Sequence, residues 1–180
     1  KFFYDSPTQR DRQDANRPAR LFVLLDVVED ATSPVDLIDK PIRTGFIEVE
    51  REVPVRVPTL EALLGDKLTA FAPRTTGVPF QPANGRPCET HQVVKQLFDV
   101  AELFDVFADL PAVARAYDSM QALENGYRGS SFSRDATLID TRNACFALAA
   151  RDLRGVVRNP EADWLWDGAQ RLRSHLINGR

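Results

Sequence analysis

The chain has 180 residues, of which 43% are apolar and 27% are charged, and this composition is ordinary for a globular protein. No apolar run approaches the roughly 18 to 20 residues that a membrane-spanning helix needs, so we expect no membrane segment. A net charge of -3 excludes a general attraction to nucleic acid. The two distant cysteines exclude a disulfide framework and a zinc site, and they favour the reduced cytoplasm.

The N-terminal part predicts strands. Residues 1–4 are aromatic and strand-like, and residues 20–30 are a run of strand formers. The polar residues 5–20 between them predict a long exposed hairpin loop or a partly disordered connection. The run over residues 20–30 predicts a central strand that is covered on both faces. Asp26 interrupts this run, and a buried carboxylate is costly unless it is paired or binds a metal. Because the chain begins without Met inside an apparent strand, we expect it to be part of a longer protein.

Proline and alternation organise the next stretch. Residues 32–43 contain two prolines and predict a loop. Residues 46–57 alternate between apolar and charged side chains, which predicts an amphipathic strand or a bent hairpin with one solvated face, and Pro54 marks an edge or a bulge there. Thr59 is a suitable N-cap for a helix that begins at Leu60 and ends near Pro73.

That helix contains an unusual lysine. Its leucines and Phe71 recur at helical spacing and predict one apolar stripe, and Lys67 lies inside the stripe. Arg74, seven residues later, is expected on the same face. Burying an ammonium without a partner costs several kcal/mol, so we expect Lys67 to meet a carboxylate, a backbone carbonyl or a phosphate. Alternatively, its stem covers apolar surface while the ammonium reaches solvent.

The C-terminal two thirds predicts helices. After a loop rich in glycine and proline over residues 75–89, we expect helices over residues 91–110, 112–125, 135–154 and 161–177, the second of these closed by Gly126. The first of them is apolar nearly all round, so we expect it to be buried on most sides, yet it contains Asp99. The sequence therefore predicts an α+β protein. Residues 1–58 would form the end of a mixed sheet, and residues 59–180 a mostly helical region.

Three features together predict a chemistry: a carboxylate in a buried strand (Asp26), cations on one helix (Lys67 and Arg74) and a carboxylate on a second helix (Asp99). Carboxylates that bind a metal opposite a cation that binds phosphate are what phosphoryl or nucleotidyl transfer requires. If these residues form one site, Lys67 and Asp99 lie within salt-bridge distance on facing helices, and Asp26 opens into the same cleft.

At these residues the sequence resembles the nucleotidyltransferases of the AbiEii/AbiGii toxin family, which belong to type IV toxin–antitoxin systems. The family helix reads Lys-x-x-Ala-x-x-x-Arg, and residues 67–74 match it in full. A later family motif reads Arg/Lys-Asp-x-x-Asp, and residues 95–99 match it except that Gln96 replaces the first Asp. The resemblance covers about residues 20–107. The Gly-Ser and Asp-x-Asp motif of such enzymes lies upstream of the matched part and is not found in this sequence.

The resemblance implies transfer of a nucleotide from an NTP to an RNA (such as tRNA) or protein acceptor, with Mg²⁺, and an antitoxin partner. It implies that Lys67 and Asp99 are catalytic, that Lys67 and Arg74 bind the nucleotide, and that Asp26 is a metal ligand. Two of the three expected carboxylates are missing, so we expect the 180-residue chain alone to be inactive. Two alternatives stay open: a purely structural ion network of Lys67, Arg74 and Asp99, and a non-catalytic protein-interaction domain.

Overall fold

The protein is described here from a computed structural model. The structure describes residues 2–5, 20–23, 33–43, 50–80, 90–153 and 159–177. The chain divides into two compact units, residues 1–32 and residues 33–180. Antiparallel strand pairs and helices occur in the described residues, which confirms the predicted α+β class. The division after residue 58 into a catalytic sheet and a helical region stays a prediction.

The first unit contains a hairpin of two short strands. β1 (Phe2–Asp5) pairs antiparallel with β2 (Arg20–Val23), and the register sets Phe2 opposite Val23. This pairing confirms the prediction that the polar stretch between them connects the two arms of a hairpin. Asp26 and the rest of the predicted central strand lie outside the described residues.

The second unit begins with another hairpin, formed by β3 (Leu37–Pro41) and β4 (Pro54–Pro58). The prediction of a loop over residues 32–43 is therefore wrong for this stretch. Its prolines suggested a loop, but Pro41 is the last residue of β3 and stands opposite Pro54, the first residue of β4. Proline is tolerated at strand ends, where its missing N–H removes no bond from the interior of a ladder.

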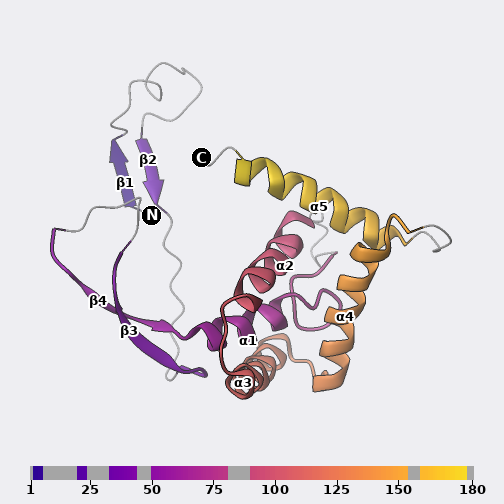
Figure 1. Cartoon of the computed structure of the whole chain (residues 1–180), viewed down its shortest axis with the longest axis horizontal. Helices are drawn as coiled ribbons and strands as arrows, with labels where there is room; N and C mark the ends of the chain where they lie inside the picture. The colour runs from indigo at the N-terminus through magenta and orange to yellow at the C-terminus, as the bar shows by residue number, and fades with distance from the viewer. Residues whose placement is uncertain are drawn as a thin grey trace. The chain divides into compact units, whose positions relative to one another are not determined.

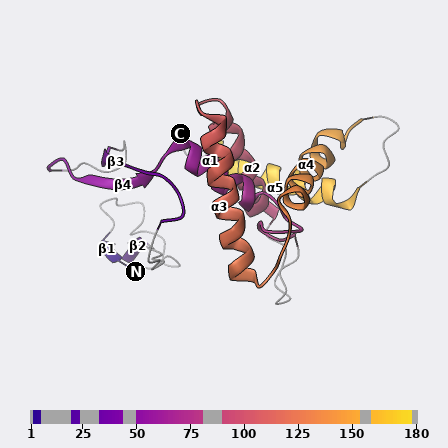
Figure 2. The same cartoon turned by 90° about the horizontal axis from the view of Figure 1, so that it is seen from below.

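Five helices follow in the described residues, and all belong to the second unit (Figures 1 and 2). α1 contacts both α2 and α3, while α5 packs along α2 and against α4. Their bounds are α1 (Leu60–Ala70), α2 (Thr90–Phe104), α3 (Leu110–Arg128), α4 (Arg134–Ala150) and α5 (Pro160–Ile177). Residues 71–80, between α1 and α2, contain no helix or strand, as predicted for residues 75–80.

Small residues let α1 pack closely against α3. A Cβ atom added at Gly65 would lie 2.6 Å from the backbone nitrogen of Tyr117, so the two backbones approach as closely as a glycine permits. The buried residues of α1 are Ala62, Leu64, Gly65 and Thr69. The predicted leucine stripe is therefore only partly buried, and Leu60 at its start is 39% exposed. Because α1 is covered by both α2 and α3, small residues are needed where the helices approach most closely. A pattern of large apolar side chains alone does not reveal those positions.

Two apolar clusters fill the helical unit. Leu64, Val100 and Val113 join α1, α2 and α3. The larger cluster joins α2, α4, α5 and the segment after α1, and it consists of Phe71, Phe80, Val93, Val94, Ala144 and Leu165. α2 is less buried than its composition suggested, because Phe98 and Phe104 remain 38% and 49% exposed.

α3 ends three residues later than predicted, at Gly129 rather than Gly126. Gly129 has a φ of 60°, a left-handed conformation that favours glycine. The Ser130 N–H donates to the Asn125 carbonyl at 2.9 Å, and the Gly129 N–H donates to the Gly126 carbonyl at 3.3 Å. The Asn125 side chain strengthens this end by accepting from the Ser130 hydroxyl and the Phe132 N–H. Gly126 is accommodated as an exposed helical residue.

Candidate active site

Lys67 is positioned by the last turns of α1. Thr59 caps the helix, and its hydroxyl accepts from the Ala62 N–H at 3.1 Å. The Lys67 carbonyl accepts the closing hydrogen bond from the Phe71 N–H at 3.0 Å. Leu64 and Leu68, on either side of Lys67, pack into the cluster that joins α1 with α2 and α3. The backbone of Lys67 is thus fixed by a capped, packed helix whose neighbour is α2.

The Lys67 ammonium meets two acceptors on α2. Its Nζ donates to Gln96 Oε1 at 3.1 Å and lies 3.3 Å from Asp99 Oδ2. The side chains of Lys67 and Asp99 are 24% and 26% exposed. The contact between Lys67 and Asp99 on neighbouring helices is therefore present as predicted, while their catalytic roles stay a prediction. About a quarter of the Lys67 side chain is therefore open to solvent.

A second lysine shares the same carboxylate. Lys95, one turn before Asp99 on α2, places its Nζ 3.7 Å from Asp99 Oδ2. Two ammonium groups therefore share one carboxylate. Ammonium groups that are only partly paired suit the binding of an anionic ligand such as a phosphate.

Arg74 does not join Lys67 and Asp99. α1 ends at Ala70, and the chain then turns so that the Gly77 N–H donates to the Ala72 carbonyl at 2.7 Å. The Arg74 guanidinium contacts Glu161 of α5, and this hydrogen bond raises the pKa of Arg74. The expectation that Arg74 lies on the Lys67 face of one continuous helix is wrong, because Arg74 lies beyond the helix end. Its proposed contact with a nucleotide stays a prediction.

Asp140 is a buried carboxylate that the sequence did not single out. It is 6% exposed, and its Oδ2 accepts from the Arg74 N–H at 2.8 Å and from the Thr75 hydroxyl at 2.9 Å. These bonds tie the segment after α1 to α4. The sequence did contain a signal for this residue, because Thr137, Asp140 and Thr141 share one face of a helix. Polar residues on a buried face imply hydrogen-bonded partners. Gln96 was likewise noticed only as a departure from a motif.

The described residues do not supply a magnesium site. Among them, no group of three or more His, Cys, Asp or Glu side chains is placed to hold a metal ion. Asp99 is already paired with two cations, which makes it a poor metal ligand. Asp26, the predicted ligand, lies outside the described residues. Mg²⁺ therefore remains a proposal that these residues do not support by themselves.

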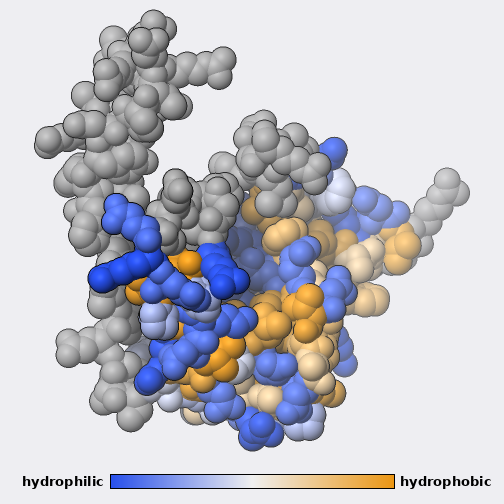
Figure 3. Space-filling view, turned by 60° about the vertical axis from the view of Figure 1, so that its left-hand side comes forward, coloured by the Kyte–Doolittle hydropathy of each residue, from blue (hydrophilic) through white to orange (hydrophobic). Residues whose placement is uncertain are grey.

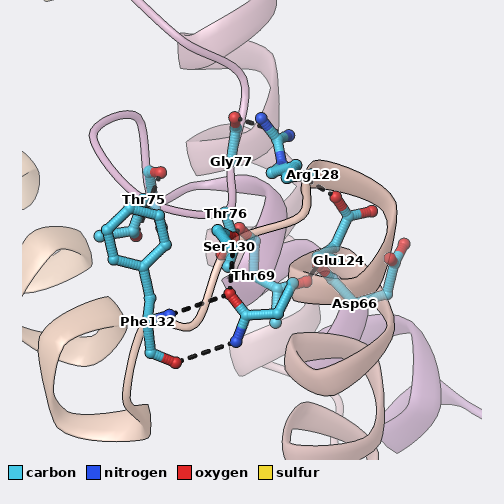
Figure 4. A network of polar contacts seen from close by, with 11 residues as sticks. Asp66, Thr69, Thr75, Thr76, Gly77, Glu124, Arg128, Ser130 and Phe132 are labelled. Atoms are coloured by element: carbon cyan, nitrogen blue, oxygen red, sulfur yellow. Dashed lines mark hydrogen bonds and ion pairs between the residues drawn. The ribbon is translucent and has the colours of Figure 1, made fainter.

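Asp66, next to Lys67 in the sequence, lies in a polar network between α1 and α3 (Figure 4). Arg128 donates to Glu124 at 3.2 Å and to the Gly77 carbonyl at 3.0 Å, and Asp66 lies beside Glu124. Burial raises the pKa of Asp66, Lys67 opposes this shift, and the Glu124 carboxylate adds to it. Ionised Asp66 is therefore a cost to the folded state.

We expect Asp66→Asn to remove one source of pH dependence. Because the pKa of Asp66 is raised in the folded state, its contribution to stability is full below the ordinary value of 3.8 and is lost as the pH rises through the folded pKa. The variant should match the wild type near pH 4 and exceed its urea midpoint above the folded pKa, in a series up to about pH 8. An equal difference between the two proteins at every pH would contradict this assignment.

Comparison with known families assigns the chain. The family described as "Nucleotidyl transferase AbiEii toxin, Type IV TA system" matches residues 3–168. The chain belongs to this AbiEii toxin family. No curated protein and no solved structure gives a match. The match includes the hairpin of the first unit, α1 to α4 and part of α5, so it extends well beyond the two motifs that carried the resemblance.

Membership of the AbiEii family fixes the general class of this protein. It is a nucleotidyltransferase-type toxin of a type IV toxin–antitoxin system, and such a system implies an antitoxin. In the part of the chain that the structure describes, no helix is long and apolar enough to cross a membrane.

Proposed function

We propose that this AbiEii protein acts in the cytoplasm and transfers a nucleotide from an NTP to an RNA, such as a tRNA, or to a protein acceptor, with Mg²⁺ as the metal. The observation that carries the proposal is the half-buried Lys67 ammonium, which Gln96 and Asp99 hold at 3.1 and 3.3 Å on the neighbouring helix. A cation fixed in this way is preorganised for a phosphate, because its hydrogen bonds need little rearrangement when the ligand binds.

In this proposal each polar group has a distinct task. Lys67 donates to the nucleotide phosphates and offsets the negative charge that develops on the leaving pyrophosphate. Asp99 holds the Lys67 ammonium in position, or accepts a proton from the acceptor group. Arg74 binds nucleotide only if a ligand displaces Glu161, since its guanidinium is engaged there. Mg²⁺, when bound, would supply charge neutralisation at the phosphates, and Asp26 is the residue proposed to hold it.

The test is a transfer assay with the full-length protein. Incubation with NTPs labelled at the α-phosphate, in the presence of total RNA and of protein, should label one class of acceptor. Lys67→Ala should abolish the labelling, while Lys40→Ala, which removes an exposed lysine of β3, should leave it unchanged. Equal labelling by the wild type and Lys67→Ala would refute the proposal.

The alternative is a protein-interaction domain that keeps the fold and the ion pair. One observation favours it: large apolar side chains lie at the surface where α2 ends and α3 begins, with Val106 55% and Leu110 61% exposed. Hydrophobic residues also reach the surface among hydrophilic ones on the face shown in Figure 3. Contiguous exposed apolar area is typical of interaction sites. Under this alternative, no acceptor is labelled, and Leu110→Ser weakens capture of a partner while Lys67→Ala does not.

A further inference from the structure

Gln96 is a buried polar residue whose orientation is fixed by its partner. Its side chain lies on α2, the residue is 9% exposed, and Oε1 accepts from Lys67 Nζ at 3.1 Å. An ammonium can only donate hydrogen bonds, so the amide must turn its oxygen, and not its nitrogen, toward Lys67. Gln96 therefore restrains the ammonium with a neutral acceptor, and Asp99 restrains it with a charged one.

Gln96 contacts the ammonium without adding charge to the site. The one carboxylate within ion-pair distance of Lys67 among the described residues is Asp99, which Lys95 also contacts, while Asp66, next to Lys67 in the chain, interacts with it more weakly. A carboxylate at position 96 would also accept from Lys67, but it would add a second negative charge at contact distance. The residue type at this position therefore changes how strongly the ammonium is neutralised before an anion binds.

We infer that Gln96 is a positioning residue that aims Lys67 without adding a second carboxylate at contact distance, so that the ammonium can bind the polyphosphate of an NTP. This inference rests on the proposed function and adds to it the residue that tunes phosphate affinity. It also explains what changes when Gln replaces the Asp that the family motif has at position 96. The Gln96 amide accepts from Lys67 and carries no charge.

The first test adds a negative charge at position 96 and keeps the shape of the side chain. In the full-length protein, Gln96→Glu should weaken the binding of inorganic tripolyphosphate about tenfold, measured by isothermal titration calorimetry at low salt, because a new anion faces the ligand. The loss should shrink as salt is added. The melting temperature should hold or rise, since the new carboxylate would pair with Lys67. A merely structural role predicts instead that binding and stability change together.

The second test removes the acceptor and keeps the charge. Gln96→Met leaves Lys67, Lys95 and Asp99 in place, so tripolyphosphate should bind within about threefold of the wild type. The ammonium loses one of its two restraints, and kcat for nucleotide transfer should fall about tenfold while KM for the NTP changes little. A fall in affinity as large as that of Gln96→Glu would contradict the charge argument.

The control and the contrary outcomes separate this inference from the proposed function. Gln170→Glu makes the same chemical change at an exposed position of α5, and it should leave tripolyphosphate binding unchanged. If the wild type is active and binds tripolyphosphate, but Gln96→Glu binds it as tightly, the inference about Gln96 is wrong and the proposed function stands. If the wild type neither binds tripolyphosphate nor transfers a nucleotide, both are wrong.

Discussion

Gly65→Ala is expected to lower the free energy of unfolding by about 2 to 3 kcal/mol, which corresponds to a fall of roughly 5 to 10 °C in melting temperature. The new methyl group would lie 2.6 Å from the backbone nitrogen of Tyr117 and 2.8 Å from Cβ of Ala116. Neither atom belongs to a flexible side-chain end, so α1 and α3 must separate. The gain of up to about 1 kcal/mol in helix propensity offsets only part of this cost.

Gly126→Ala is the matched control for this effect. Gly126 also lies in a helix, but a Cβ atom added there meets nothing within 4 Å. The same substitution should therefore raise the free energy of unfolding by about 0.5 to 1 kcal/mol. Urea unfolding of both variants measures the two signs. Stabilisation by both substitutions would show that α1 and α3 pack less closely than described.

Lys67→Met is expected to reduce nucleotide transfer by the full-length protein by about 100- to 1,000-fold while changing stability by about 1 kcal/mol or less. Met matches the unbranched stem of Lys67, so packing against α2 is largely kept. The substitution removes one partner from Asp99 and one from the buried Gln96 amide oxygen, but the Asp99 side chain is 26% exposed and Lys95 still lies 3.7 Å away. The cost of burying the Lys67 charge also disappears, which offsets part of this loss. Losing a partner here should cost far less than the roughly 3 to 5 kcal/mol of a fully buried pair.

Asp99→Asn and the double variant decide between a site and a structural pair. If Lys67 and Asp99 serve mainly the fold, each single variant is strongly destabilised and the double variant recovers much of the loss. If they serve mainly a ligand, both single variants melt near the wild type, and each loses transfer activity. Thermal melting and the transfer assay on the same preparations distinguish the two results, and strong rescue of stability in the double variant would sink the catalytic assignment.

The sequence was sufficient to locate the helices and the central contact, although it extended α2 to residue 110 when that helix ends at Phe104. Lys67 lies in an apolar stripe and Asp99 lies on a second apolar helix, so each charge is costly to bury without a partner. Their contact at 3.3 Å follows from this cost. Periodicity of apolar residues likewise located α4 and α5 to within a few residues. These features depend on local pattern and on simple electrostatics, which one sequence contains.

Other features depend on contacts between distant residues and could not be predicted. Arg74 was placed on the α1 face because the pattern continues past Ala70, whereas Asp140, 66 residues later, holds the backbone of Arg74 away from that helix. β3 was missed because its partner strand, not its own composition, makes it a strand. The end of α3 was misplaced because two glycines lie three residues apart, and only the bonds around Asn125 select Gly129.

The hydrogen bond from the Arg74 backbone N–H to Asp140 allows hydrogen exchange at Arg74 to measure how firmly α4 packs against the segment that follows α1. That amide donates to a side chain of α4, and the Arg74 guanidinium is held by α5. Its proton can exchange with solvent only when α4 withdraws, so its exchange rate in deuterated water should follow the opening of α4 rather than the fraying of α1. The segment that follows α1 is therefore held in place by residues that lie 66 and 87 positions further along the chain.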